Sequence, residues 1–125
     1  MPAARSIAIL VVDDQQTMRG MARQVLKQLG VLDVALAASA EAALEQMGGR
    51  KFDVVISDLN MPGMSGVELA QKIKAHPVLK SVPVFLATSN AYRDQAGDAV
   101  DHFVAKPFVV GDLKEALEAH LGALT

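Results

Sequence analysis

The 125-residue chain contains no cysteine, which excludes a disulfide framework and a thiolate metal site. It has 12 basic and 14 acidic residues, for a net charge of −2. This near balance predicts neither a basic stripe for nucleic acid nor a cationic face for membranes. The N-terminal apolar run is short and lacks the cleavage pattern of a signal peptide or the length of a membrane span. We therefore expect a cytoplasmic protein.

Internal repeats, linkers and low-complexity tracts are also missing from the sequence. The length is typical of one compact domain. Hydrophobic residues make up 51% of the chain, which is enough to form a core. We therefore expect residues 1–125 to form a single domain, and we expect that domain to be a monomer.

The sequence does contain five short apolar runs, at residues 7–12, 33–38, 52–57, 82–87 and, more weakly, 102–105. They are nearly continuous rather than alternating, which is typical of strands covered on both faces. Between them, apolar residues at helical spacing predict helices over 16–29 and 40–47, a third from Ser65 to before Pro77, and a last one around 113–121. This spacing also predicts Met18, Met21 and Met47 in the core. Alternating strands and helices indicate an α/β fold: a doubly wound, five-stranded parallel sheet with helices on both faces.

Several residues predict where these helices begin and end. Gly30 offers a left-handed cap after the first helix, and Ser39 an N-cap for the second. Gly48-Gly49 is expected to stop the second helix, since the "GGRK" segment lacks the spacing of a phosphate-binding loop. Ser65 with Glu68 forms the pattern of a capping box.

Charged and hydroxyl residues stand where the predicted strands end. Asp13-Asp14 follows the first run, Asp58 the third, Thr88 the fourth and Lys106 the fifth. In an open parallel sheet these carboxyl ends form the ligand crevice. Three carboxylates at one place need a compensating cation, and oxygen ligands favour Mg²⁺ over zinc. A metal, an ammonium and a hydroxyl around one carboxylate are suited to receiving a phosphoryl group.

Each of these residues also has a simpler interpretation when it is taken alone. Asp58 could be an ordinary loop or cap residue, and Asp13-Asp14 could favour the N-terminus of a helix. Lys106 could lie on the surface, and Phe103 could be a core aromatic. Only the joint placement of the acids, the threonine and the lysine favours a functional site.

Four segments, "VVDDQQTMR", "DLNMPGMSG", the threonine after "VFLA", and "FVAKPF", occur in this order along the chain. Together they resemble the receiver domains of bacterial two-component response regulators, most closely the stand-alone, CheY-like type. The resemblance covers essentially the whole chain. It implies a flavodoxin-like fold and signalling by phosphorylation rather than turnover of a substrate.

The resemblance implies a metal site around the acceptor. Asp58 would accept the phosphoryl group and bind Mg²⁺ together with Asp14. The backbone carbonyl of Asn60 would be a third ligand, and Asp13 would reach the ion through water.

The resemblance also implies roles around the phosphoryl group. Thr88 would bond a phosphate oxygen and Lys106 would pair with the phosphate, with the Lys106–Pro107 peptide bond in the cis form. Phe103 occupies the position of the family's aromatic switch residue, which acts with Thr88. Asn60 and Asn90 occupy the positions that tune dephosphorylation.

The implied partners are a sensor histidine kinase or phosphotransfer protein and a downstream protein target. Three alternatives remain open. A haloacid dehalogenase-type aspartyl-phosphate phosphatase also uses a strand-end aspartate with Mg²⁺, but it would want a carboxylate where this chain has Asn60. A flavodoxin relative would need a hydroxyl-rich phosphate loop, whereas "DDQQT" is acidic. A receiver-shaped scaffold that is never phosphorylated would not need the intact acids, threonine and lysine.

The segment between Thr88 and Lys106 is about four residues shorter than in a typical receiver, roughly one helical turn. Its apolar stripe, Tyr92, Ala96 and Val100, is thin and interrupted by Gly97. We therefore expect a shortened fourth helix of at most about two turns, ordered more fully by phosphorylation.

Overall fold

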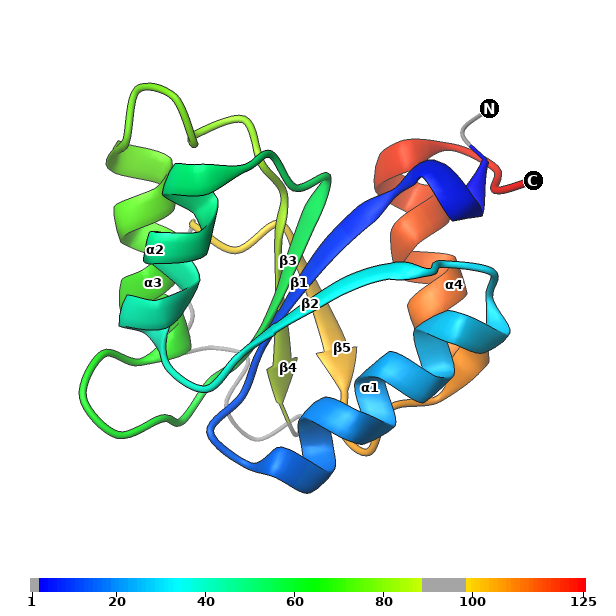
Figure 1. Ribbon diagram of the computed structural model, residues 1–125, viewed down its shortest axis with the longest axis horizontal. Helices are drawn as coiled ribbons and strands as arrows, with labels where there is room; N and C mark the ends of the chain where they lie inside the picture. Colours follow the sequence, from blue (N-terminus) through cyan, green and yellow to red (C-terminus); the bar gives the residue numbers. More distant parts are fainter. Residues whose placement is uncertain (1–2, 89–98) are drawn as a thin grey trace.

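The structure, a computed structural model, describes residues 3–88 and 99–125. Five parallel strands form one sheet in the order β2-β1-β3-β4-β5 (Figure 1). The strands are β1 Ala8–Val12, β2 Asp33–Ala37, β3 Val54–Asp58, β4 Val84–Thr88 and β5 His102–Ala105. The predicted five-stranded parallel sheet is therefore confirmed, with each strand lying within or next to its apolar run.

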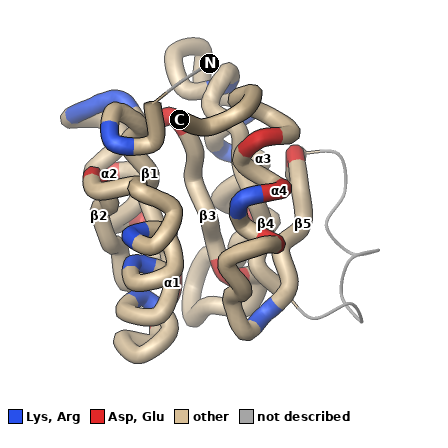
Figure 2. Tube along the Cα trace, turned by 90° about the vertical axis from the view of Figure 1, so that its right-hand side faces the viewer, with Lys and Arg blue, Asp and Glu red and all other residues tan. Residues whose placement is uncertain are grey.

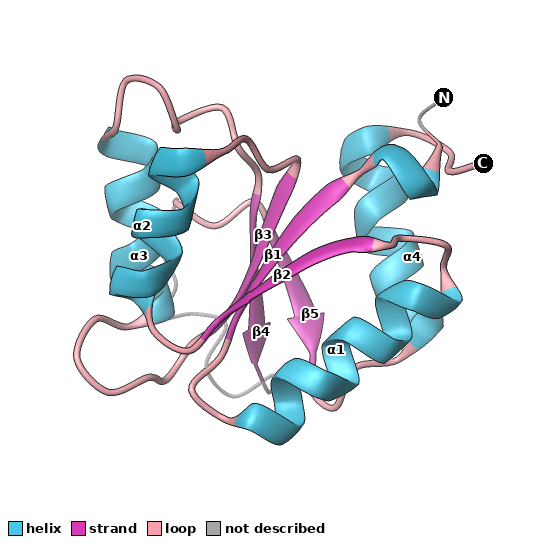
Figure 3. Ribbon diagram, viewed as in Figure 1, coloured by secondary structure: helices cyan, strands magenta, loops and turns pink. Residues whose placement is uncertain are grey.

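The described helices cover both faces of this sheet. They are α1 Gln16–Gln28, α2 Ala40–Gly49, α3 Gly66–Ala75 and α4 Val110–Leu121, after a short 3₁₀ turn at Ala4–Ser6. Helices α1 and α4 lie on one face, and α2 and α3 on the other (Figure 3). Alternate residues of β1 enter the two cores, since Ile9 and Val11 face α1 and α4 while Leu10 and Val12 face α2 and α3. All four side chains are almost completely buried, which explains why the apolar runs are continuous.

The predicted helix boundaries follow from local hydrogen bonds. The Ser39 side chain accepts the N–H of Ala42 at the start of α2. Ser65 and Glu68 form both bonds of a capping box before α3. Gly30 follows α1 with a φ of 90°, the left-handed conformation that glycine adopts without strain. The expected caps are thus confirmed.

Two details of the helices differ from expectation. Met21 is 42% exposed, because it lies at the edge of the buried stripe of α1 that contains Ala22 and Leu26. Gly48 and Gly49 form the last residues of α2 rather than ending it beforehand.

The charges on α1 are of one sign. Arg19, Arg23 and Lys27 are spaced four residues apart, which places them along one side of the helix (Figure 2). α1 contains no acidic residue. The balanced net charge of the chain therefore does not extend to each helix.

The expected fourth helix, within residues 89–101, falls mostly outside the described residues. Residues 99–101, the described end of that segment, are not helical. Within residues 3–88 and 99–125, no helix is long and apolar enough to cross a membrane.

Candidate functional site

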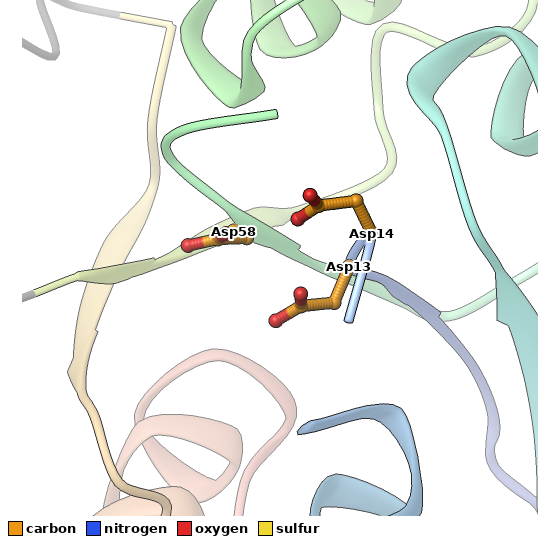
Figure 4. Close-up of side chains that lie close together, drawn as sticks. All are labelled: Asp13, Asp14 and Asp58. Atoms are coloured by element: carbon orange, nitrogen blue, oxygen red, sulfur yellow. The ribbon is translucent and has the colours of Figure 1, made fainter. Parts of the chain in front are cut away.

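Three carboxylates meet at the carboxyl ends of β1 and β3. Asp13 and Asp14 follow β1, and Asp58 is the last residue of β3. The two strands are neighbours, with Val12 opposite Ser57, so the residues that follow lie side by side. One oxygen from each acid lies within 4.8 Å of the others, and Figure 4 shows the three side chains grouped at this edge. The sequence prediction that these acids converge is confirmed.

Lys106 brings a positive charge into this group. It follows β5, and its Nζ lies 3.1 Å from Asp13 Oδ2 and 3.1 Å from Asp58 Oδ1. Because β4 lies between β3 and β5, the lysine side chain must cross the end of β4 to make these contacts. The Lys106–Pro107 bond is cis, as the family resemblance predicted. One ammonium group therefore contacts two of the three acids.

Asp13 is held in place from both its side chain and its backbone. Its Oδ1 accepts the N–H of Gln15 at 2.9 Å, and its carbonyl accepts a hydrogen bond from Arg19 Nη1 at 2.7 Å. The side chain is only 2% exposed. The sequence analysis missed Arg19, although a basic residue one turn into the helix after two acids was a usable signal.

The pKa values show how burial and charge act on the site. Burial raises the pKa of Asp58, and the nearby Asp13 charge adds to this effect, while the hydrogen bond from Lys106 only partly offsets it. Burial acts to lower the pKa of Lys106, but hydrogen bonds to Asp13 and Asp58 outweigh it and raise that pKa. The negatively charged form of Asp58 is therefore disfavoured, mainly by burial, even with Lys106 beside it.

This donor set fits Mg²⁺. The ion is hard and binds oxygen, usually through one or two carboxylates with several waters retained. Asp13, Asp14 and Asp58 present three carboxylates against the single ammonium of Lys106, which leaves negative charge for a cation to neutralise. Asp14 is exposed, so the site is open to water on that side.

The loop after β3 brings its backbone close to Asp58, the last residue of that strand. The N–H of Gly66 donates to the carbonyl of Leu59 at 2.9 Å. A Cβ at Gly66 would contact the carbonyl oxygen of Asp58 and the Cδ1 of Leu86. Only glycine fits here, so the loop closes beside Asp58 and leaves its carboxylate at the edge of the sheet.

The remaining predicted residues are placed as follows. Thr88 is buried at the end of β4, one residue beyond the register partner of Asp58. Asn60 is exposed, two residues after Asp58. Phe103 on β5 is partly buried against Leu59 and Leu86. Asn90 lies outside the described residues.

Comparison with known proteins identifies the class. The model of the response regulator receiver domain family matches residues 9–118, so the chain belongs to the receiver domain family of two-component signalling, whose function is carried by phosphorylation. The chain is 40% identical over 114 residues to the chemotaxis protein CheY of Pseudomonas aeruginosa, covering 88% of this chain and 92% of that protein. The CheY-like resemblance is therefore confirmed.

Solved structures of receiver domains have the same fold as this chain. The response regulator TrrA of Thermotoga maritima, determined in complex with Mg²⁺ and BeF, superposes with a TM-score of 0.82 at 34% identity, covering 92% of this chain and 99% of that chain. The receiver domain of a sensor histidine kinase from Pseudomonas aeruginosa, with a magnesium ion coordinated in its active site cleft, also gives a TM-score of 0.82, at 26% identity over 94% and 98% of the two chains. The flavodoxin-like fold is thus shown. The acidic cluster of Asp13, Asp14 and Asp58 is suited to hold the same ion.

Proposed function

We propose that Asp58 accepts a phosphoryl group from a histidine kinase or a histidine phosphotransfer protein. The observation that carries this proposal is the position of Asp58: it lies within 4.8 Å of two other carboxylates and 3.1 Å from Lys106. A carboxylate next to an ammonium group and a cation-binding cluster is placed to receive a group that brings further negative charge. Family membership supports the same role.

The residues around Asp58 would each contribute to a Mg²⁺ site. Asp14 and Asp58 would hold Mg²⁺ directly, with the Asn60 backbone carbonyl as a further ligand, and Asp13 would hold it through water. When bound, the ion supplies positive charge to the phosphoryl oxygens. The relatives TrrA and the kinase receiver domain, which bind magnesium in their structures, support this assignment.

In the transfer step, an Asp58 oxygen attacks the phosphorus of a phosphohistidine. A P–O bond forms and the P–N bond breaks, and the leaving imidazole takes its proton from solvent. Lys106 would then move its hydrogen bond from the carboxylates toward a phosphoryl oxygen, and the Thr88 hydroxyl would donate to another. The buried position of Thr88 at the next strand end supports this role.

Loss of the phosphoryl group would occur by attack of water on the same phosphorus. Asn60 and Asn90 would orient that water, and since neither side chain carries a charge to act as a base, we expect modest autodephosphorylation. On this account the protein is a signalling receiver that catalyses only its own phosphorylation and dephosphorylation.

The output would be a change in partner binding, or onward transfer of the phosphoryl group, by a single cytoplasmic domain acting as a monomer. Thr88 and Phe103 would transmit the change to the surface near β5. The partial burial of Phe103 against Leu59 and Leu86 supports this, because Leu59 directly follows the acceptor.

The test compares substitutions of two aspartates at opposite ends of β3. Asp58 ends β3, whereas Asp53 directly precedes it. We expect Asp58→Asn to take up no label from a phosphorylated histidine kinase domain or from acetyl phosphate, with Mg²⁺ present. Asp53→Asn should be labelled like the original protein. Stable labelling of Asp58→Asn would show that the acceptor lies elsewhere.

A further inference from the structure

A surface groove lies where α2 ends and where the chain leaves α3. It consists of two adjoining hollows of about 740 and 660 Å³. Both hollows are lined by Met47, Gly48, Val78 and Leu79, so they form one continuous depression. We call it the amino-end groove, because other lining residues directly precede strands: Phe52-Asp53 before β3, and Val82-Pro83 before β4. The acidic cluster lies at the opposite, carboxyl end of the same strands.

The groove presents apolar side chains to solvent. Among the apolar residues that line it, Val78 is 72% exposed, Met47 is buried and Leu79 is partly buried. The turn that holds Val78 outward is fixed, because His76 Nδ1 accepts the N–H groups of Val78 at 3.1 Å and of Leu79 at 3.3 Å. An exposed aliphatic residue on a hydrogen-bonded turn is a preformed contact point for another apolar surface.

Two glycines line the groove at positions where neither the backbone conformation nor a close neighbour requires glycine. Gly48 and Gly49 lie in the last turn of α2 with ordinary helical backbone angles, and a Cβ on either would meet nothing within 4 Å. Glycine in a helix is less stable than alanine. What two adjacent glycines provide at such a position is room for a second backbone to approach closely.

The charges along the groove are mainly of one sign. Arg50, Lys51 and Lys72 line it, and Asp53 is the one acidic lining residue. The charge of Arg50 is already compensated, because its Nη2 lies 2.6 Å from Asp33 Oδ2, so the two lysines carry the positive charge. Asp53 Oδ2 already accepts the N–H of Ala8 at 2.8 Å. Within residues 3–88 and 99–125, Lys51 and Lys72 make no ion pair. The groove therefore offers positive charge around an apolar floor.

We propose that the amino-end groove binds an acidic, amphipathic helix of a partner protein. Its apolar side would contact Val78 and Leu79, its backbone would pass over Gly48-Gly49, and its carboxylates would pair with Lys51 and Lys72. This follows the general helix-in-groove mode of recognition, in which apolar anchors give affinity and charge gives selectivity. The proposal does not depend on phosphorylation of Asp58.

The first experiment uses two labelled peptide probes. Each has leucine at positions i, i+3, i+4 and i+7 of a helix, with glutamate at the other positions in one probe and lysine in the other. We expect the glutamate probe to bind by fluorescence anisotropy, about tenfold more tightly than the lysine probe, with chemical shift changes confined to the groove residues. Equal binding of both probes, or shift changes on the basic side of α1, would overturn the proposal.

The second experiment uses the glycines. Gly48→Ala with Gly49→Ala should raise the melting temperature, because neither Cβ meets another atom, yet weaken binding of the glutamate probe about tenfold. Gly20→Ala on α1 is the matched control: its Cβ also meets nothing within 4 Å, so it should raise stability without altering binding. Unchanged binding in the double variant would contradict a close backbone approach.

The third experiment reverses the charges. Lys51→Glu with Lys72→Glu should weaken binding of the glutamate probe and let the lysine probe bind, since both exposed residues line the groove. The sedimentation velocity of the original protein is measured alongside. If the protein forms dimers that Val78→Ser dissociates, the groove binds a second copy of the chain and the proposal is wrong.

Discussion

Two lysines at opposite ends of the sheet both bind carboxylates, but the pairs that they form differ in their effect on the carboxylate pKa. Lys74, in the last turn of α3, lies at the amino ends of β4 and β5. Its Nζ donates to Asp101 Oδ2 at 2.7 Å and to the carbonyl of Val82 at 3.2 Å. The same Asp101 oxygen accepts the N–H of Val84 at 2.8 Å. One cation meets one anion here, with no charge left over.

Lys106, at the carboxyl end, faces a cluster of three acids. Burial acts to raise the pKa of Asp101, but the hydrogen bonds from Lys74 and Val84 outweigh burial and lower it. At the other end, burial and the Asp13 charge outweigh Lys106 and raise the pKa of Asp58. Both lysines contact carboxylates at hydrogen-bonding distance. The difference therefore lies first in burial, since the Asp58 side chain is 13% exposed against 30% for Asp101, and then in the added charge of Asp13. A compensated pair holds the fold together, whereas an uncompensated cluster is able to bind a cation or a transferred group.

The largest expected difference is in phosphorylation. Lys106→Met should slow labelling of Asp58 by about 100-fold, the usual cost of losing one group that stabilises developing charge. Lys74→Met should change the rate less than about twofold, because its ammonium lies at the far end of the strands. Initial rates of labelling from acetyl phosphate provide the measurement. Similar rates in the two variants would remove the functional distinction between the two lysines.

Cation binding should also be confined to the carboxyl end. At a concentration 100 times its dissociation constant, Mg²⁺ should stabilise the folded protein by about 2.7 kcal/mol. Asp14→Ala should abolish this gain, because it removes one of the clustered carboxylates, while Asp101→Asn should retain it. Thermal unfolding with and without MgCl₂ separates these outcomes. A full Mg²⁺ effect in Asp14→Ala would place the ion at another site.

Breaking the compensated pair should destabilise the protein. Asp101→Ala leaves Lys74 and the Val84 N–H without their shared acceptor, a loss of about 2 kcal/mol. Because the folded pKa of Asp101 is lowered, its contribution is complete above the ordinary aspartate pKa of about 3.9 and is lost as pH falls through the lower folded value. Urea unfolding at pH 7 and below pH 4 measures both effects. A variant as stable as the original at pH 7 would show that the pair contributes nothing.

Removing the charge of Asp58 should stabilise the protein, in contrast to the loss of stability expected for Asp101→Ala. In the absence of Mg²⁺, Asp58→Asn should stabilise the protein by about 1 kcal/mol at pH 7, a modest value because the site is partly open to solvent. The folded pKa of Asp58 is raised, so the penalty on its charge is full above that pKa and disappears as pH falls toward the unfolded value of about 3.9. The two proteins should therefore converge in stability at low pH. A destabilised Asp58→Asn at pH 7 would mean that the Lys106 contact outweighs burial.

The sequence was sufficient to predict the sheet and the convergence of Asp13, Asp14, Asp58 and Lys106, because each of these residues directly ends or follows an apolar run. In a parallel sheet, position at a strand end translates directly into position in space. Helix caps such as Ser39 were predictable for a similar reason, since their partners lie within one turn along the chain.

Contacts between distant segments were not predictable in this way. Lys74 and Asp101 are 27 residues apart, and no sequence pattern around either residue predicts that they pair. Met21 follows the helical period of α1 but lies at the margin of its buried stripe, where periodicity alone does not decide exposure.

The length of β3 has a consequence for how partners share the molecule. The strand has five residues, Val54–Asp58, so about 13 Å separates its first and last Cα atoms at roughly 3.3 Å per residue. A protein docked over Asp58 would leave the amino-end groove uncovered. A partner helix bound in that groove would hold the domain at high effective concentration beside its partner, while Asp58 would remain accessible to a second protein that donates or receives the phosphoryl group.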